Sequence, residues 1–162
     1  MPLFGGCWYS RWPHPPPMSD ASLGLTVSPA ALAKLAESAI GAPVTWDHGA
    51  MAAVLASPPG GERAAAAADP MNIGLVKASW VDSTGAARVV FEVNGPAASA
   101  LVLSGLVVHL SATHVVGTTR FVELAIRKSP ARPGCDIDGR VLSVMEYIRL
   151  HPPPANRDHV SS

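Results

Sequence analysis

The chain has 162 residues, 48% of them hydrophobic and only 15% charged, which is typical of one globular domain and argues against a disordered chain. Twelve basic and twelve acidic residues cancel, so net charge provides no attraction to nucleic acid or to an anionic membrane. Because we find neither a run of 18 apolar residues nor a signal-like N-terminus, we expect no membrane partner and no secretion.

The two cysteines, Cys7 and Cys135, lie far apart in the sequence. This usage predicts free thiols in a reducing compartment, without a disulfide framework. No spacing of histidine and cysteine matches a zinc site, so we expect no metal and no other cofactor.

The first third of the chain predicts strands around one helix. Residues 3–12 are rich in aromatic side chains and favour a strand, residues 13–22 form a loop, and residues 23–27 are extended. A helix is expected over 28–41, because it begins at a serine–proline pair, carries apolar residues at helical spacing and ends at a glycine. Residues 44–48 then form a short strand.

Residues 49–72 fit no single pattern. Alanine-rich pieces at 50–56 and 62–68 favour helix by propensity, but such short helices are marginal on their own. We interpret this stretch as a mobile insertion.

The rest of the chain predicts a hairpin, a helix and further strands. In chain order, we expect strands at 73–81 and 87–93, a helix at 96–104, and strands at 107–116 and 120–128. Residues 141–150 fit a strand or a helix equally well.

This order of elements predicts a mainly β fold with surrounding helices (α+β), built on a curled sheet or β-barrel of about six to seven strands. Residues 1–150 form the single domain, and the proline-rich residues 151–162 form a flexible tail.

Three residues on separate strand-like segments are candidates for chemistry: His48, Ser111 and Glu123. A serine is a poor nucleophile unless a neighbouring base takes its proton, and a carboxylate can hold that base in place. Each residue also has a simpler interpretation. His48 fits a surface histidine, Ser111 a small packing residue, and Glu123 a solvent-facing residue on an edge strand.

Strand alternation assigns faces to these residues. It puts Ser111 on the face of His109, which we treat as structural, and puts Glu123 on the face of Phe121 and Ala125. A buried carboxylate in the middle of a strand is costly without a partner, so the functional interpretation is that it orients the histidine.

A proline-bounded loop at residues 130–134 contains Ala131 and Arg132. Two prolines and a glycine restrict its backbone, so it could aim an amide and a guanidinium at an oxyanion. The alternative is an ordinary tight turn.

Together these segments resemble the capsid-maturation proteases, which are the prohead proteases of tailed phages and the assemblins of herpesviruses. The similar segments span roughly residues 3–137. They are Phe4 to Trp8, Gly41 to Val44 before His48, Ile73 to Val76 with the hairpin, Gly105 to Ser111, and Glu123-Leu124-Ala125-Ile126-Arg127-Lys128-Ser129-Pro130-Ala131-Arg132-Pro133-Gly134. Assemblins carry a second histidine where this chain has Glu123, so the acid is more similar to the phage version. The gap between His48 and Ile73 is longer than in the family, and Ser104 is the nearest alternative nucleophile.

The resemblance implies a serine endopeptidase that cleaves scaffold and capsid proteins inside an assembling viral procapsid, in the cytoplasm or nucleus of the host. His48 would be the base, Ser111 the nucleophile and Glu123 the orienting acid. The backbone at Ala131 and Arg132 would bind the oxyanion. The resemblance also implies a homodimer, with residues 141–150 as its surface.

Two other functions stay open at this point. The chain could be a catalytically inactive structural protein of the same fold that interacts with capsid or scaffold. It could also be a small β-barrel binding module, which predicts that His48 and Ser111 lie far apart.

Overall fold

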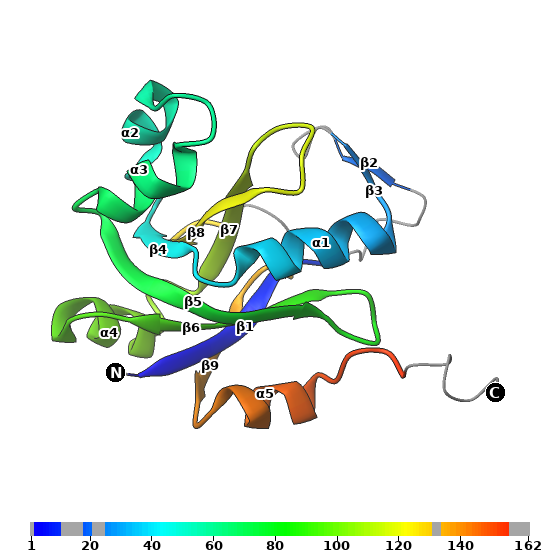
Figure 1. The fold of residues 1–162 in the computed structure, drawn as a ribbon. Helices are drawn as coiled ribbons and strands as arrows, with labels where there is room; N and C mark the ends of the chain where they lie inside the picture. Colours follow the sequence, from blue (N-terminus) through cyan, green and yellow to red (C-terminus); the bar gives the residue numbers. More distant parts are fainter. Residues whose placement is uncertain (1, 11–17, 21–24, 131–133, 156–162) are drawn as a thin grey trace.

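The computed structural model describes residues 2–10, 18–20, 25–130 and 134–155. Its centre is a seven-stranded curled sheet in the order β7-β8-β4-β5-β6-β1-β9 (Figure 1). The strands are β1 (Leu3–Tyr9), β4 (Pro43–Trp46), β5 (Asn72–Val81), β6 (Ala87–Val93), β7 (His109–His114), β8 (Phe121–Arg127) and β9 (Ile137–Val141). The predicted mainly β, α+β fold with a curled sheet is therefore confirmed.

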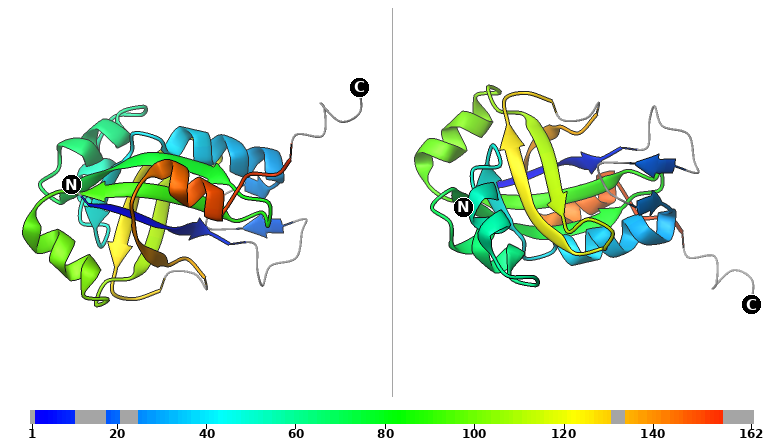
Figure 2. Two further views of the ribbon diagram at one scale, coloured as in Figure 1. Left: turned by 90° about the horizontal axis from the view of Figure 1, so that it is seen from below. Right: turned by 90° about the horizontal axis from the view of Figure 1, so that it is seen from above.

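The remaining elements surround this sheet. They are a two-stranded ribbon of β2 (Met18–Asp20) and β3 (Leu25–Val27), and the helices α1 (Pro29–Ala39), α2 (Met51–Ala56), α3 (Glu62–Ala68), α4 (Pro96–Leu103) and α5 (Val144–Leu150). Helix α1 packs on β5, β8 and β6, and the view from below shows α5 in front of the sheet, on the side away from α1 (Figure 2). The main core therefore lies between the sheet and α1.

Helix α1 forms where its sequence predicts it. The Ser28 hydroxyl accepts a hydrogen bond from the Ala31 amide at 3.1 Å, and Gly41 takes a left-handed φ of +84° just after the helix. Its apolar face, including Leu32 and Leu35, is buried in the main core. The predicted hairpin of β5 and β6 and the helix after it are also present.

The curl of the sheet brings its first and last strands together. The Leu110 amide of β7 donates to the Cys135 carbonyl at 2.9 Å, and the Cys7 amide of β1 donates to the Asp136 carbonyl at 3.0 Å. The Ile137 amide, at the start of β9, donates to the Val108 carbonyl at 2.6 Å. The segment 135–137 thus joins the β7 end of the sheet to the β1–β9 end.

Residues 49–72 are not the loose insertion that we expected. Ala50, Val54 and Ala66 of this stretch are buried in a second apolar cluster with Val122 of β8. Helix α3 lies on β8 and β4, and α2 packs on α3 (Figure 1). Helix propensity alone underestimates the stability of such short helices, because burial against a sheet stabilises them.

Two further boundaries differ from the prediction, and one open alternative is decided. Residues 18–20 form β2 inside the expected loop. Of the two alternatives for residues 141–150, the helix is confirmed as α5, whose start is capped by Ser143. The expected tail begins with two tethered residues, since Trp80 Nε1 donates to the His151 carbonyl at 2.7 Å and the Ser83 amide donates to the Pro152 carbonyl at 2.9 Å.

A polar network centred on Arg88 attaches α5 to the sheet. Arg88 Nε donates to Asp82 Oδ2 at 2.8 Å, and its guanidinium also donates to Asp138 and to the Tyr147 hydroxyl. Burial raises the pKa of Asp82, but hydrogen bonds from Thr84 and Arg88 outweigh it and hold that pKa below its usual range. The folded protein therefore stabilises the ionised form of Asp82.

Asp82→Asn should lower the free energy of unfolding by about 2 kcal/mol at pH 7, because Arg88 loses a buried charged partner. A depressed folded-state pKa stabilises the protein above the ordinary aspartate pKa of about 3.9, and this stabilisation is lost as pH falls through the lower folded value. Urea unfolding should therefore show the two proteins converging below about pH 4. Exposed Glu37→Gln is the matched control and should change stability by less than about 0.5 kcal/mol. An Asp82→Asn difference that does not depend on pH would contradict this account.

Candidate active site

His48 lies in a tight turn directly after β4, and not in the strand that we predicted for 44–48. Asp47 and His48 have positive φ values of 48° and 58°, a left-handed conformation that costs energy in residues other than glycine. The turn is held by hydrogen bonds from the Gly49 amide to the Trp46 carbonyl at 2.8 Å and from the Asp47 amide to the Ile126 carbonyl at 2.9 Å. These bonds fix the histidine against β8.

Gly49 lies in a closely packed part of this turn. A Cβ atom there would lie 2.7 Å from Met71 Cγ and 3.0 Å from the Trp46 carbonyl oxygen. The sequence His48-Gly49 therefore suits a turn that passes close to its neighbours.

Ser111 and Glu123 lie on neighbouring antiparallel strands. Ser111 of β7 is opposite Ala125 of β8, and Thr113 is opposite Glu123. Because side chains alternate along a strand, Ser111, Thr113 and Glu123 share one face, with Ser111 and Glu123 diagonal to each other.

A bulge in β8 sets which face its first residues occupy. The register shifts between Thr113 and His114, so Phe121 is opposite His114 and Val122 is an extra residue. Phe121 therefore packs into the main core, with its ring 5.3 Å from Trp8, while Val122 faces α2 and α3. The expected sharing of one face by Phe121 and Glu123 is wrong for this reason.

The three predicted side chains form one hydrogen-bonded chain. The distance between His48 Nε2 and Ser111 Oγ is 2.8 Å, and that between His48 Nδ1 and Glu123 Oε1 is 3.1 Å. With Glu123 ionised, Nδ1–H donates to the carboxylate, so Nε2 accepts the Ser111 hydroxyl proton. Thr113 Oγ1, 3.3 Å from Nδ1, is a weaker second partner.

The side chains of this hydrogen-bonded series differ in how deeply they are buried. The side chain of Glu123 is fully buried on a strand that lies between β7 and β4, which excludes the solvent-facing edge position. His48 keeps 25% of its side-chain surface exposed, so its ring connects the interior to the surface. Within the described residues Glu123 Oε2 has no hydrogen-bond partner, which is costly for a buried carboxylate.

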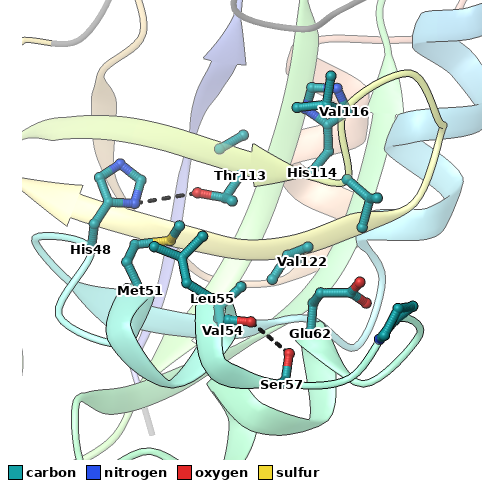
Figure 3. A pocket seen from close by; sticks show the side chains of 13 residues that line it. His48, Met51, Val54, Leu55, Ser57, Glu62, Thr113, His114, Val116 and Val122 are labelled. Carbon is teal, nitrogen blue, oxygen red and sulfur yellow. Dashed lines mark hydrogen bonds between the residues drawn. The ribbon is translucent and has the colours of Figure 1, made fainter.

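A groove of about 530 Å³ begins beside the His48 ring (Figure 3). It runs between α2 and the β7–β8 hairpin and is lined mainly by apolar side chains, among them Met51, Val54 and Val122. The hydrogen-bonded chain is therefore next to a cavity within the usual size range of ligand sites.

A second histidine–carboxylate pair lies on the same strand. His109 Nδ1 is 2.6 Å from Asp136 Oδ1, and the two residues also form a backbone bridge. We expected His109 to be structural, and this pair attaches the segment after the 130–134 loop to β7. Asp136 and Thr113 were not singled out in the sequence, because only the fold brings them to these histidines.

The other predicted residues do not join the hydrogen-bonded chain in the described part of the structure. Ala131 and Arg132 lie outside the described residues. The Ser104 hydroxyl donates to the Leu101 carbonyl at 2.7 Å at the end of α4. Cys7 and Cys135 are both buried and form no disulfide. A hydrogen bond with Cys135, burial and the charge of Cys135 raise the pKa of Cys7, which argues against a reactive thiolate.

We compared the chain with known proteins and found no match, neither in a scan against protein-family models nor in a search of curated proteins. Among the described residues, no cluster of three or more His, Cys, Asp or Glu side chains could hold a metal ion. In the same part of the chain, no helix has the length and apolar character needed to cross a membrane.

Glu123→Met should leave the free energy of unfolding unchanged or raise it by about 1–2 kcal/mol, because it removes a buried carboxylate with one unpartnered oxygen. The His48 side chain is 25% exposed to water, so the substitution leaves no fully buried histidine without its partner. Urea unfolding at pH 7 measures the change, with exposed Glu37→Met as the control. A loss greater than about 1 kcal/mol would mean that Glu123 supports the fold itself.

Proposed function

We propose that this chain is a serine endopeptidase in which Ser111 is the nucleophile, His48 the general base and Glu123 the orienting acid. The hydrogen-bonded chain from Ser111 through His48 to the buried Glu123 is the observation that carries the proposal. Its heavy-atom distances are within the range expected for a nucleophile, its base and an orienting group.

The proposed reaction is acyl transfer. His48 Nε2 takes the Ser111 hydroxyl proton as Oγ attacks the peptide carbonyl, and the resulting imidazolium is stabilised by Glu123. His48 then gives this proton to the leaving amine, which departs and leaves an acyl ester on Ser111. Water then attacks the ester carbonyl while His48 takes its proton. The ester C–O bond breaks, His48 returns the proton to Ser111 Oγ, and the acid product is released.

The oxyanion is assigned to the backbone at Ala131 and Arg132, as the family resemblance implies. A backbone hydrogen bond next to this loop supports the assignment. Cys135, three residues after Arg132, accepts a hydrogen bond from the amide of Leu110, the residue before Ser111. Cys135, just after this loop, therefore lies beside β7 next to the proposed nucleophile. A preorganised oxyanion donor is typically worth about 3–4 kcal/mol.

The proposed substrates are scaffold and capsid proteins, cleaved inside an assembling viral procapsid within the host cell. This part of the proposal depends on the resemblance of residues 3–137 to the capsid-maturation proteases. We extend it to a homodimer through residues 141–150, where Leu142 before α5 and Met145 and Leu150 within it are exposed.

Of the other two functions, the small binding module required His48 and Ser111 to be far apart. Their contact at 2.8 Å makes that expectation wrong. The inactive structural protein of the same fold is left for experiment to separate from the enzyme.

A biotinylated fluorophosphonate should label the folded protein at Ser111, because Nε2 of His48 can remove the hydroxyl proton as the phosphorus is attacked. Peptide mass spectrometry identifies the labelled residue. Ser111→Ala should lose the label, and Ser104→Ala is the matched control that should keep it. Glu123→Gln should slow labelling by roughly 10²–10⁴-fold, because the imidazolium loses its carboxylate. Absence of labelling in the folded wild-type protein would favour the inactive structural protein.

Co-expression with the scaffold and capsid proteins of the virus that encodes the chain should yield their shortened forms. Ser111→Ala should leave both proteins at full length, while circular dichroism shows that the variant is folded. Equal cleavage by both forms of the chain would contradict the proposed nucleophile.

A further inference from the structure

The groove beside His48 has an apolar rim that the described part of the chain leaves uncovered. Leu55 of α2 is 80% exposed and Val116 of the β7–β8 turn is 73% exposed, and both line the groove (Figure 3). The floor between them is formed by Met51, Val54, Val115 and Val122. Apolar residues that face each other across an open cavity are typical of a binding surface.

The charges of the groove favour some ligands over others. Among the described residues that line it, Glu62 is the one acidic residue and none is a lysine or an arginine. Hydrogen bonds from backbone amides at Glu62 itself and at Gly60 hold the pKa of Glu62 below its usual range, so its carboxylate is ionised at neutral pH. The groove therefore suits an apolar side chain and disfavours an acidic one.

His48 links the groove to the proposed reaction. Its ring is one wall of the groove, and Nε2 of the same ring contacts Ser111, which is not itself a lining residue. In acyl transfer Nε2 must reach the nitrogen of the leaving amine, so the residue that carries this nitrogen lies against the imidazole. The side chains that follow the cleaved bond are therefore the nearest substrate groups to the groove.

We propose that this groove is a specificity site for a bulky apolar side chain, Leu, Ile, Met or Phe, within the first two residues after the cleaved bond. The inference rests on the proposed serine endopeptidase and adds a substrate preference to it. The volume of about 530 Å³ holds a large side chain, and the flexible Met51 at the His48 end can adapt to different shapes.

The test is digestion of a defined mixture of synthetic peptides by the full chain, with each cleaved bond identified by mass spectrometry. We expect cleavage to be at least about tenfold more frequent where a bulky apolar residue occupies one of the first two positions after the bond. Peptides with Asp or Glu at the preferred one of these two positions should be the poorest substrates.

Leu55→Asp places a charge on the exposed rim without removing a core residue, and should reduce this preference about tenfold. Labelling of this variant at Ser111 by a small fluorophosphonate shows that its active site is still assembled, because a small reagent does not fill the groove. Leu106→Asp is the matched control: this leucine is similarly exposed but does not line the groove, so the preference should be unchanged.

The outcomes separate the two proposals. Labelling of Ser111 together with a preference that is absent, lies before the cleaved bond, or survives Leu55→Asp would overturn the groove assignment and leave the enzyme standing. A wild-type protein with neither labelling nor cleavage would overturn both.

Discussion

The imidazole of His48 connects two diagonal positions of adjacent strands, and the candidate site depends on this one bridge. Ser111 and Glu123 share a face only because β7 and β8 pair in one particular register. A slip of one residue on either strand would turn one of these side chains to the other face. The bulge at Val122 keeps Phe121 in the core without moving Glu123, so packing of the core and alignment of the site are compatible.

The same region holds several features that are unfavourable for folding alone. Asp47 and His48 adopt left-handed backbone conformations, and Glu123 and Thr45 bury polar oxygens that have no partner among the described residues. Strained backbone conformations and unpaired buried polar atoms are common at functional sites. These unfavourable features lie at the end of β4 and in the adjoining part of β8. The main core, in contrast, is built from ordinary apolar contacts such as the Phe4–Phe91 pair.

Local sequence signals were sufficient for much of the fold. The serine–proline start and glycine end of α1 and the turn between β5 and β6 are short-range patterns, and each formed as expected. The three site residues could be chosen because a histidine, a serine and a carboxylate interrupt otherwise apolar segments, and because the segments around them resemble one family.

Long-range effects account for what the sequence did not reveal. The bulge in β8 depends on pairing with β7, and the packing of α2 and α3 depends on Val122 of a distant strand. The turn at Asp47 and His48 requires a hydrogen bond to Ile126, nearly eighty residues later in the chain. Asp136 could not be matched to His109 until the curl of the sheet brought segment 135–137 to β7.

The protonation of the His48 ring is the most direct test of the central bridge. Long-range ¹H–¹⁵N correlation spectra of the neutral imidazole should show the proton on Nδ1, where Glu123 accepts it, with Nε2 free to accept from Ser111. In Glu123→Met the proton should return to Nε2, the form that isolated imidazole side chains prefer in water. A wild-type protein with the proton on Nε2 would contradict the account, because that nitrogen could not then take the proton of Ser111.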